Sequence, residues 1–270
     1  MGDLYSLLKN KLNKIEVNGK TLYIAEGDTL LDDDQLKIYA DVREKENAAR
    51  EAAKEADKKG VGAMRLEVGR GLVAMTKDGK VIRWKPGTVL SYRVVRSTFD
   101  PAEYQLVVAN LKAATEAWEK TCGVNFQHVA DKDGEDGTGQ NGCLFVAYKF
   151  DAGGSVIASS FFPSDPPDRR HLLIDPSYFT TGFDKVGVFR HELGHILGFR
   201  HEHIRNEAPP VCPNEPLWDV QVLGQYDPHS VMHYFCGGVG SHDLQITELD
   251  RKGARMVYGP PLGAAALVDA

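Results

Sequence analysis

The stretch HELGHILGFRH at positions 191–201 constrains this chain more than any other part of it. His191 and His195 are four residues apart, so on a helix their imidazoles lie on one face, close enough to share a metal ion. Glu192 lies alongside the same site, and the glycine three residues after the second histidine ends the helix. The chain can then turn and bring His201 round as a third ligand. Three histidines that leave one position to water are typical of a catalytic zinc site, because structural zinc sites use four protein ligands.

A second motif follows downstream, where the sequence reads SVMHY at residues 230–234. The pattern HExxHxxGxxH followed by a methionine-containing turn is that of the metzincins. With GFRHEHIR at 198–205 and YDPHSVMHY at 226–234, the chain resembles the astacin family of zinc endopeptidases. The resemblance is close in the catalytic half and extends more weakly over most of the chain. The acidic stretch that follows the arginine in that family is missing after Arg205.

The resemblance implies a role for each residue of the first motif. His191, His195 and His201 would bind Zn²⁺, one ion per chain, and Glu192 would be the general base and acid. Zinc lowers the pKa of bound water to about 7. Glu192 would take the proton from this water and later deliver it to the leaving amine.

Three further residues receive roles from the same resemblance. Met232 would lie beneath the metal in the turn that carries it. Tyr234 would be an additional zinc ligand that swings away to donate a hydrogen bond to the reacting carbonyl. Glu202 would anchor the N-terminus of the matured enzyme.

The N-terminal region carries a shorter motif, Glu26-Gly27-Asp28. Astacin zymogens have a similar Gly-Asp motif, preceded by a phenylalanine where this chain has Ala25. The resemblance implies that the Asp28 carboxylate occupies zinc in place of water and keeps the enzyme inactive, since carboxylates are ordinary zinc ligands. The alternative is an aspartate of a common turn dipeptide.

Periodicity and turn residues predict an α+β fold. The start Asp100-Pro101-Ala102-Glu103 predicts a helix over 100–121, and Asp184 is the expected N-cap of the metal-binding helix. Further helices are expected at 35–59 and 247–258. Alternating apolar residues predict strands at 15–17, 21–24, 72–76, 80–84, 89–95, 124–129, 144–150, 156–162 and 171–174. The 156–162 strand is the expected edge at which a substrate would add as a further strand.

The resemblance also predicts how these elements are organised. Residues 1–75 would form a propeptide-like segment with a charged helix, linked by the glycine-rich stretch 60–71. Residues 76–270 would form the catalytic domain, with two lobes. The upper lobe, 76–201, would contain a mixed sheet, a backing helix and the active-site helix. The lower lobe, 202–270, would be mostly irregular and end in a helix.

The composition limits which partners the protein can bind and in which cellular compartment it acts. The formal charge of −6 argues against nucleic acid or anionic lipid as a partner, and no 18-residue apolar run could span a membrane. We expect a monomer that acts on proteins or peptides and is activated by another protease. Family and cysteines favour secretion, although the first residues lack the apolar region of a signal peptide.

The four cysteines, Cys122, Cys143, Cys212 and Cys236, suit two disulfides of an exported enzyme. Four buried reduced thiols are the alternative. Of the three possible connectivities we prefer Cys122–Cys143 with Cys212–Cys236.

The sequence leaves three candidate functions. The first is a zinc endopeptidase made as a zymogen. The second is a zinc-containing module that binds a protein without cutting it. The third is a zinc hydrolase such as an aminopeptidase, but these usually take their third ligand from a distant glutamate, unlike the histidine spacing here.

Overall fold

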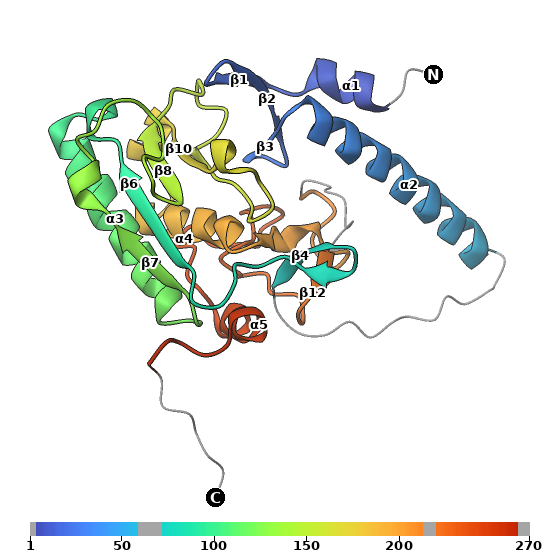
Figure 1. Cartoon of the computed structure of the whole chain (residues 1–270). Helices are drawn as coiled ribbons and strands as arrows, with labels where there is room; N and C mark the ends of the chain where they lie inside the picture. The colour runs from blue at the N-terminus through green and yellow to red at the C-terminus, as the bar shows by residue number, and fades with distance from the viewer. Residues whose placement is uncertain (1–3, 59–71, 213–219, 264–270) are drawn as a thin grey trace, which may run out of the picture.

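The computed structural model describes residues 4–58, 72–212 and 220–263. It has five α-helices and three sheets within this part of the chain, which confirms the α+β class (Figure 1). The predicted linker at 60–71 lies outside the described residues. None of the described helices is both long enough and apolar enough to cross a membrane.

The largest sheet has five strands in the order β7-β6-β8-β10-β9. Its strands are β6 Val89–Val94, β7 Asn125–His128, β8 Phe145–Lys149, β9 Ala158–Ser159 and β10 His171–Ile174. All pairs are parallel except β10 with β9. The central strand β8 is buried on both faces, as its almost unbroken apolar sequence requires.

Two helices, α3 (Pro101–Glu119) and α4 (Lys185–Ile196), pack together against one face of this sheet (Figure 1). The predicted capping box is present, because Asp100 accepts from backbone amides of α3 while Glu103 accepts from the Asp100 amide. Trp118 of α3 is fully buried, and its indole Nε1 donates to the Arg190 carbonyl of α4 at 2.9 Å. This bond and the buried run of α4 over residues 187–196 fix the helix in the core.

The N-terminal segment covers the opposite face. It contains α1 (Leu4–Lys11), the sheet β1-β2-β3 and α2 (Asp33–Lys58). The three strands are β1 Lys14–Val17, β2 Lys20–Ala25 and β3 Thr29–Leu31. Apolar residues of these strands pack on Val146, Tyr148 and Leu173, which alternate with the residues of β8 and β10 that face α3 and α4. The hairpin is therefore a layer of the fold, and α2 leads away from it (Figure 1).

A small sheet, β11-β4-β12 with β5 paired to β4, includes the strand that directly follows α4 in the chain. Its strands are β4 Val73–Lys77, β5 Lys80–Val81, β11 Phe199–Arg200 and β12 Val220–Val222. Most of the described part of 202–246 is irregular, and α5 (Glu248–Tyr258) follows with a second capping box formed by Thr247 and Asp250. β4 begins at Val73, so the proposed boundary at residue 75 falls inside a strand that pairs with β11 and β12.

The cysteine pairing is half as predicted. Cys212 and Cys236 form a disulfide, with their Cα atoms 5.2 Å apart. The preferred Cys122–Cys143 pairing is wrong, because both residues are buried free thiols. They precede β7 and β8, which lie on opposite sides of β6, about 10 Å from each other. That separation exceeds the reach of a disulfide.

The predicted strand at 156–162 is also wrong in extent. Only Ala158 and Ser159 form ladder pairs, with Ile174 and Leu173 of β10. The apolar residues around them are buried by packing against the core instead of by a longer strand. β9 is nevertheless the last strand of its sheet, as expected of the edge.

Candidate metal centre

Helix α4 carries His191, Glu192 and His195 in its C-terminal half. All residues of this helix from 187 to 196 are buried. It begins at Asp184, whose side chain accepts from the Gly187 amide at 2.6 Å, as an N-cap should. All three residues are at most 4% exposed. Such burial of two imidazoles and a carboxylate is costly unless a ligand or partner compensates.

The third histidine arrives through a turn that only glycine fits. Gly198 has φ +91, and a Cβ there would meet the Ile82 carbonyl oxygen at 2.8 Å. β11 follows at once, and its pairing with β4 delivers His201 beside the two helical histidines. The predicted helix end and turn are thus both present.

Second hydrogen bonds fix the tautomers of the helical histidines. His191 Nδ1 donates to the Val231 carbonyl and His195 Nδ1 donates to the Phe199 carbonyl, both at 2.8 Å. Carbonyls only accept, so these Nδ1 atoms hold protons and the Nε2 atoms point inward. Burial lowers the pKa of His195 to about 4, against the charge of Asp28, so its imidazole is neutral at pH 7.

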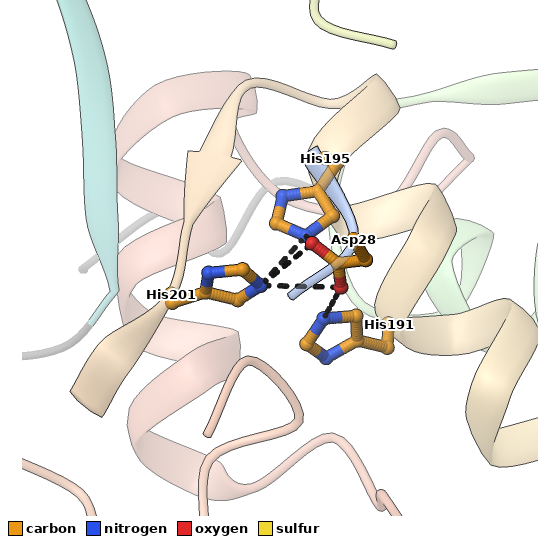
Figure 2. A group of neighbouring side chains, drawn as sticks. All are labelled: Asp28, His191, His195 and His201. Carbon is orange, nitrogen blue, oxygen red and sulfur yellow. Dashed lines mark hydrogen bonds and ion pairs between the residues drawn. The ribbon is translucent and has the colours of Figure 1, made fainter. Parts of the chain in front are cut away.

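Asp28 of the N-terminal segment completes the group (Figure 2). One carboxylate oxygen lies 3.2 Å from His191 Nε2, and the other lies 3.2 Å from His201 Nε2 and 3.7 Å from His195 Nε2. The donor atoms of the four residues all lie within 4.8 Å of one another. Asp28 therefore lies beside the three histidines, and its role as the zinc ligand of a zymogen stays a prediction.

This arrangement fits a cation. The Nε2 atoms of His195 and His201 are 3.1 Å apart. The Nε2 atom of the neutral His195 imidazole carries a lone pair and lies near the Asp28 carboxylate, so two electron-rich groups face each other. Burial raises the pKa of Asp28, but the His201 and His195 imidazoles outweigh it and hold that pKa well below its usual range. An ionised carboxylate and three nitrogens at this spacing match the donor types and the four-coordinate geometry of zinc.

Glu192 lies beside this group with its carboxylate poorly satisfied. Its Oε2 is buried and accepts no hydrogen bond from the described residues. Burial, and next the charge of Asp28, raises the pKa of Glu192 well above its usual range. Its backbone carbonyl accepts from Ser160 Oγ at 2.9 Å, which ties the helix to the segment after β9. A desolvated carboxyl group at a metal site is a suitable proton acceptor.

Met232 packs against α4 at Gly194, and the ring of Tyr234 lies against those of His191 and His201. Met232 is fully buried against α4, so close that a Cβ on Gly194 would meet its Sδ at 2.3 Å. The Tyr234 ring is 4.4 Å from that of His201, centroid to centroid. Its hydroxyl donates to the Glu26 carbonyl at 2.8 Å, so it is engaged with the N-terminal segment. Its predicted role as a zinc ligand stays a prediction.

Glu202 is fully buried next to His201. Its Oε1 accepts from Arg205 Nη1 and from the Asp227 amide, each at 3.0 Å, while Oε2 accepts no hydrogen bond from the described residues. Burial raises the pKa of Glu202 to about 9, against the charge of Arg205. A buried oxygen that lacks a donor suits the predicted anchor for an amino terminus, which remains a prediction.

Two contacts around the centre were not predicted. Glu26 pairs with Arg200, and Asp250 of α5 accepts from Ser230 Oγ at 2.6 Å and from the Val231 amide at 2.9 Å. The sequence shows Asp250 only as the capping residue of α5. Nothing in the spacing of Glu26 and Arg200 joins residues so far apart in the chain.

A cleft runs past the centre. A cavity of about 330 Å³ is lined by residues 154–158, by His191, Glu192 and Tyr234, and by Gly27 and Asp28 of the N-terminal segment. The N-terminal segment thus lies in the space that leads to the centre.

Comparison with known proteins gives one family match. Residues 83–208 match the model of the peptidase M10 family, the matrixins, and this segment includes the motif at 191–201. No curated protein matches the chain.

Two solved structures are similar over most of this chain. Myroilysin has a TM-score of 0.47 at 18% identity, over 67% of this chain and 97% of its own. High choriolytic enzyme 1, a hatching enzyme zinc-protease from Oryzias latipes (medaka fish), has a TM-score of 0.46 at 17% identity, over 69% of this chain and 99% of its own.

Proposed function

We propose that this chain is a zinc-dependent endopeptidase of the metzincin type that is made as a zymogen, and the matrixin match over residues 83–208 supports the peptidase part of this proposal. It would hydrolyse internal peptide bonds of proteins, with the astacins as the family it resembles most. The observation that carries the proposal is the buried meeting of three histidine nitrogens with one carboxylate from the N-terminal segment.

In this proposal His191, His195 and His201 hold one Zn²⁺, with Tyr234 as an additional ligand in the matured form. When bound, zinc would activate a water molecule and polarise the substrate carbonyl. Glu192 would accept the proton of that water and return it to the leaving amine, which suits a carboxyl group whose pKa is raised by burial.

After removal of the N-terminal segment, Tyr234 would lose the Glu26 carbonyl that its hydroxyl now contacts. The hydroxyl could then donate to the developing oxyanion of the substrate, a contribution of about 3 kcal/mol in comparable sites. Met232, packed beneath α4, would keep the histidines in place without binding the metal.

Latency would follow from Asp28, whose carboxylate takes the place that water needs. The segment is also held by other contacts, since Ser159 Oγ donates to the Asp28 carbonyl and Tyr234 donates to that of Glu26. An ordinary turn aspartate would not require these buried contacts. The propeptide would end before β4, which pairs with β11 and β12 and would stay with the catalytic domain, instead of at residue 75. An activating protease would cut in the stretch before β4, and Glu202 would receive the new amino terminus.

The formed Cys212–Cys236 disulfide supports an extracellular enzyme, because disulfides persist in oxidising compartments. We propose a secreted monomer on this basis.

The test uses the full-length chain purified with zinc in the medium. Metal content is measured, then casein hydrolysis before and after limited trypsin treatment, with and without a chelator. We expect about one zinc per chain, little activity before cutting, and chelator-sensitive activity after it. The variant Glu192→Ala should keep the zinc and lose most turnover, by about 10²-fold or more, and Asp28→Ala should be active uncut.

Two results decide against the proposal. A chain without stoichiometric zinc would remove its basis. A chain that binds zinc and still cuts no protein after trypsin treatment would instead support the non-catalytic binding module. Equal basal activity of Asp28→Ala and the unmodified chain would exclude the zymogen mechanism alone.

A further inference from the structure

One wall of the cleft at the metal centre is a segment without regular structure. Residues 152–157, all within the described part of the chain, belong to no helix or strand, and residues 154–157 line the cavity at the centre. We call residues 152–157 the wall segment. Two adjacent glycines, Gly153 and Gly154, make its ordering costly in backbone entropy. Bonds from elsewhere in the fold are therefore needed to hold it in place.

Asp175 supplies three of these bonds. It directly follows β10 and is 1% exposed. Its Oδ2 accepts from the Ala152 amide at 2.7 Å and from the Gly154 amide at 3.3 Å, and its own amide donates to the Ile157 carbonyl at 3.1 Å. One residue thus ties both ends of the wall segment to the large sheet.

The other carboxylate oxygen of Asp175 has a separate task. This Oδ1 atom accepts from the Ser177 amide at 2.8 Å and caps the short helix η4 (Pro176–Phe179). Burial raises the pKa of Asp175, but the hydrogen bonds from Ser177, Ala152 and Gly154 outweigh it and hold that pKa below its usual range. The carboxylate is therefore ionised at neutral pH, and its bonds to the wall segment are charge-assisted.

The wall segment continues into residues that contact both sides of the cleft. Ser159 Oγ donates to the Asp28 carbonyl, and Ser160 Oγ donates to the Glu192 carbonyl at 2.9 Å. A substrate chain that adds to the edge strand β9 would run along residues 156–159. Any shift of the wall segment would therefore move the pairing partner of the substrate backbone relative to the metal centre.

We infer that Asp175 is a positioning residue, which fixes the wall segment where an extended substrate can pair with it. This inference rests on the proposed endopeptidase function. Asp175 itself is too buried to touch a substrate, and it is not one of the four residues grouped at the metal centre. Its effect should therefore be on substrate binding, while the chemistry stays with the residues of α4.

The variant Asp175→Asn separates the two tasks of the side chain. The asparagine oxygen can still accept from the Ser177 amide, because asparagine is as good an N-cap as aspartate. Its NH2 group then faces the amides of Ala152 and Gly154, and donors cannot bond to donors. The wall segment should lose this anchor while η4 keeps its cap.

Kinetics are measured on chains that are folded at full length and then cut with trypsin. For a peptide substrate of about eight residues, KM should rise about 10-fold in Asp175→Asn, and kcat should change less than about 2-fold. The split arises because pairing with the wall segment is equal in the ground state and the transition state. Asp100→Asn changes another N-cap aspartate, on α3, and should alter neither value.

A second measurement does not require activity. Hydrogen exchange of the folded, uncut chain is followed by mass spectrometry in the same two variants. Exchange over residues 150–157 should be at least about 10-fold faster in Asp175→Asn, while α3 and α4 keep the protection of the unmodified chain. Asp100→Asn should leave the wall segment unchanged.

Ser177→Ala tests the same wall segment if Asp175→Asn does not fold. It removes the hydroxyl that donates to the Val156 carbonyl at 3.2 Å and keeps the backbone amide that Asp175 caps. KM should rise about 3-fold, again with little change in kcat.

The outcomes distinguish failure of the assignment from failure of the proposed function. If no form cuts any peptide, the proposed function fails, and hydrogen exchange still decides whether Asp175 holds the wall segment. If peptides are cut and the folded variant has an unchanged KM, or loses kcat instead, the assignment of Asp175 is overturned. Unchanged exchange over residues 150–157 overturns it as well.

Discussion

At the scale of single residues, Gly27 shows how closely the N-terminal segment fits the centre. It has φ +88, and a Cβ there would lie 2.6 Å from the Tyr234 hydroxyl oxygen. Gly27→Ala should therefore push the segment out of the cleft and raise the basal casein cleavage of the uncut chain several-fold. Gly19→Ala is the matched control, because Gly19 has φ +74 and nothing within 4 Å. Equal basal activity of the two variants would mean that the close contact does not matter for latency.

Gly194 makes the corresponding contact inside the catalytic part. A Cβ on it would meet Met232 Sδ at 2.3 Å. Both residues are buried in the core, so Gly194→Ala should destabilise the chain by about 1–3 kcal/mol and lower its zinc content. Urea unfolding and metal analysis measure the two effects. Gly134→Ala, where nothing lies within 4 Å of the added Cβ, should change neither.

At the scale of elements, the turn that carries Met232 is held between two helices. His191 of α4 donates to the Val231 carbonyl, and the Val231 amide donates to Asp250 of α5. Ser230 donates to the other oxygen of the same carboxylate. The position of α5 is therefore linked through one turn to a proposed zinc ligand.

Asp250 should make stability depend on pH. Burial raises its pKa to about 6, against the hydrogen bonds from Ser230, Thr247 and Val231. Because the folded pKa lies above the unfolded value, the contribution of Asp250 to stability is full below about pH 4 and is lost as pH rises to about 6. The free energy of unfolding of the metal-free chain should thus fall, relative to that of Asp250→Asn, by about 2 kcal/mol between pH 4 and 7. Parallel lines for the two proteins in urea unfolding across this range would contradict it.

The elements predicted from sequence are those whose signals are local. The helix at α3 follows from its capping box and apolar stripe, and the strand at β10 from a short apolar run between turn residues. α1 was missed because only Leu8 of its residues is buried, so its stability depends on α2, with which it packs. The 156–162 strand was overextended because buried apolar residues look alike whether a ladder or a loop buries them.

The residues of the site also divide into those that local spacing predicts and those that only tertiary packing brings together. The histidine spacing predicts the three imidazoles, because a helix and one glycine turn place them. The Glu26–Arg200 pair joins residues 174 positions apart. Only the packing of the N-terminal segment on the catalytic part brings them together, and no spacing in a single sequence reports that.

At the scale of the whole molecule, the cysteines predict a definite thiol count. One disulfide is formed, and burial raises the pKa of the free Cys122 thiol to about 12. The folded chain should therefore resist alkylation, the denatured chain should take up two groups, and the denatured and reduced chain four. Mass spectrometry distinguishes these states. Rapid alkylation of the folded chain, or none after denaturation alone, would contradict the assignment.

The N-terminal hairpin has a consequence for whatever remains when it leaves. Its strands cover an apolar surface next to the large sheet. This surface is formed by Val146, Tyr148, Ala152, Val156 and Leu173. Once uncovered, that surface would meet water next to the working cleft. A matured form would then self-associate, or adsorb to apolar surfaces, more readily than its precursor. The N-terminal segment would therefore keep the chain soluble as well as inactive.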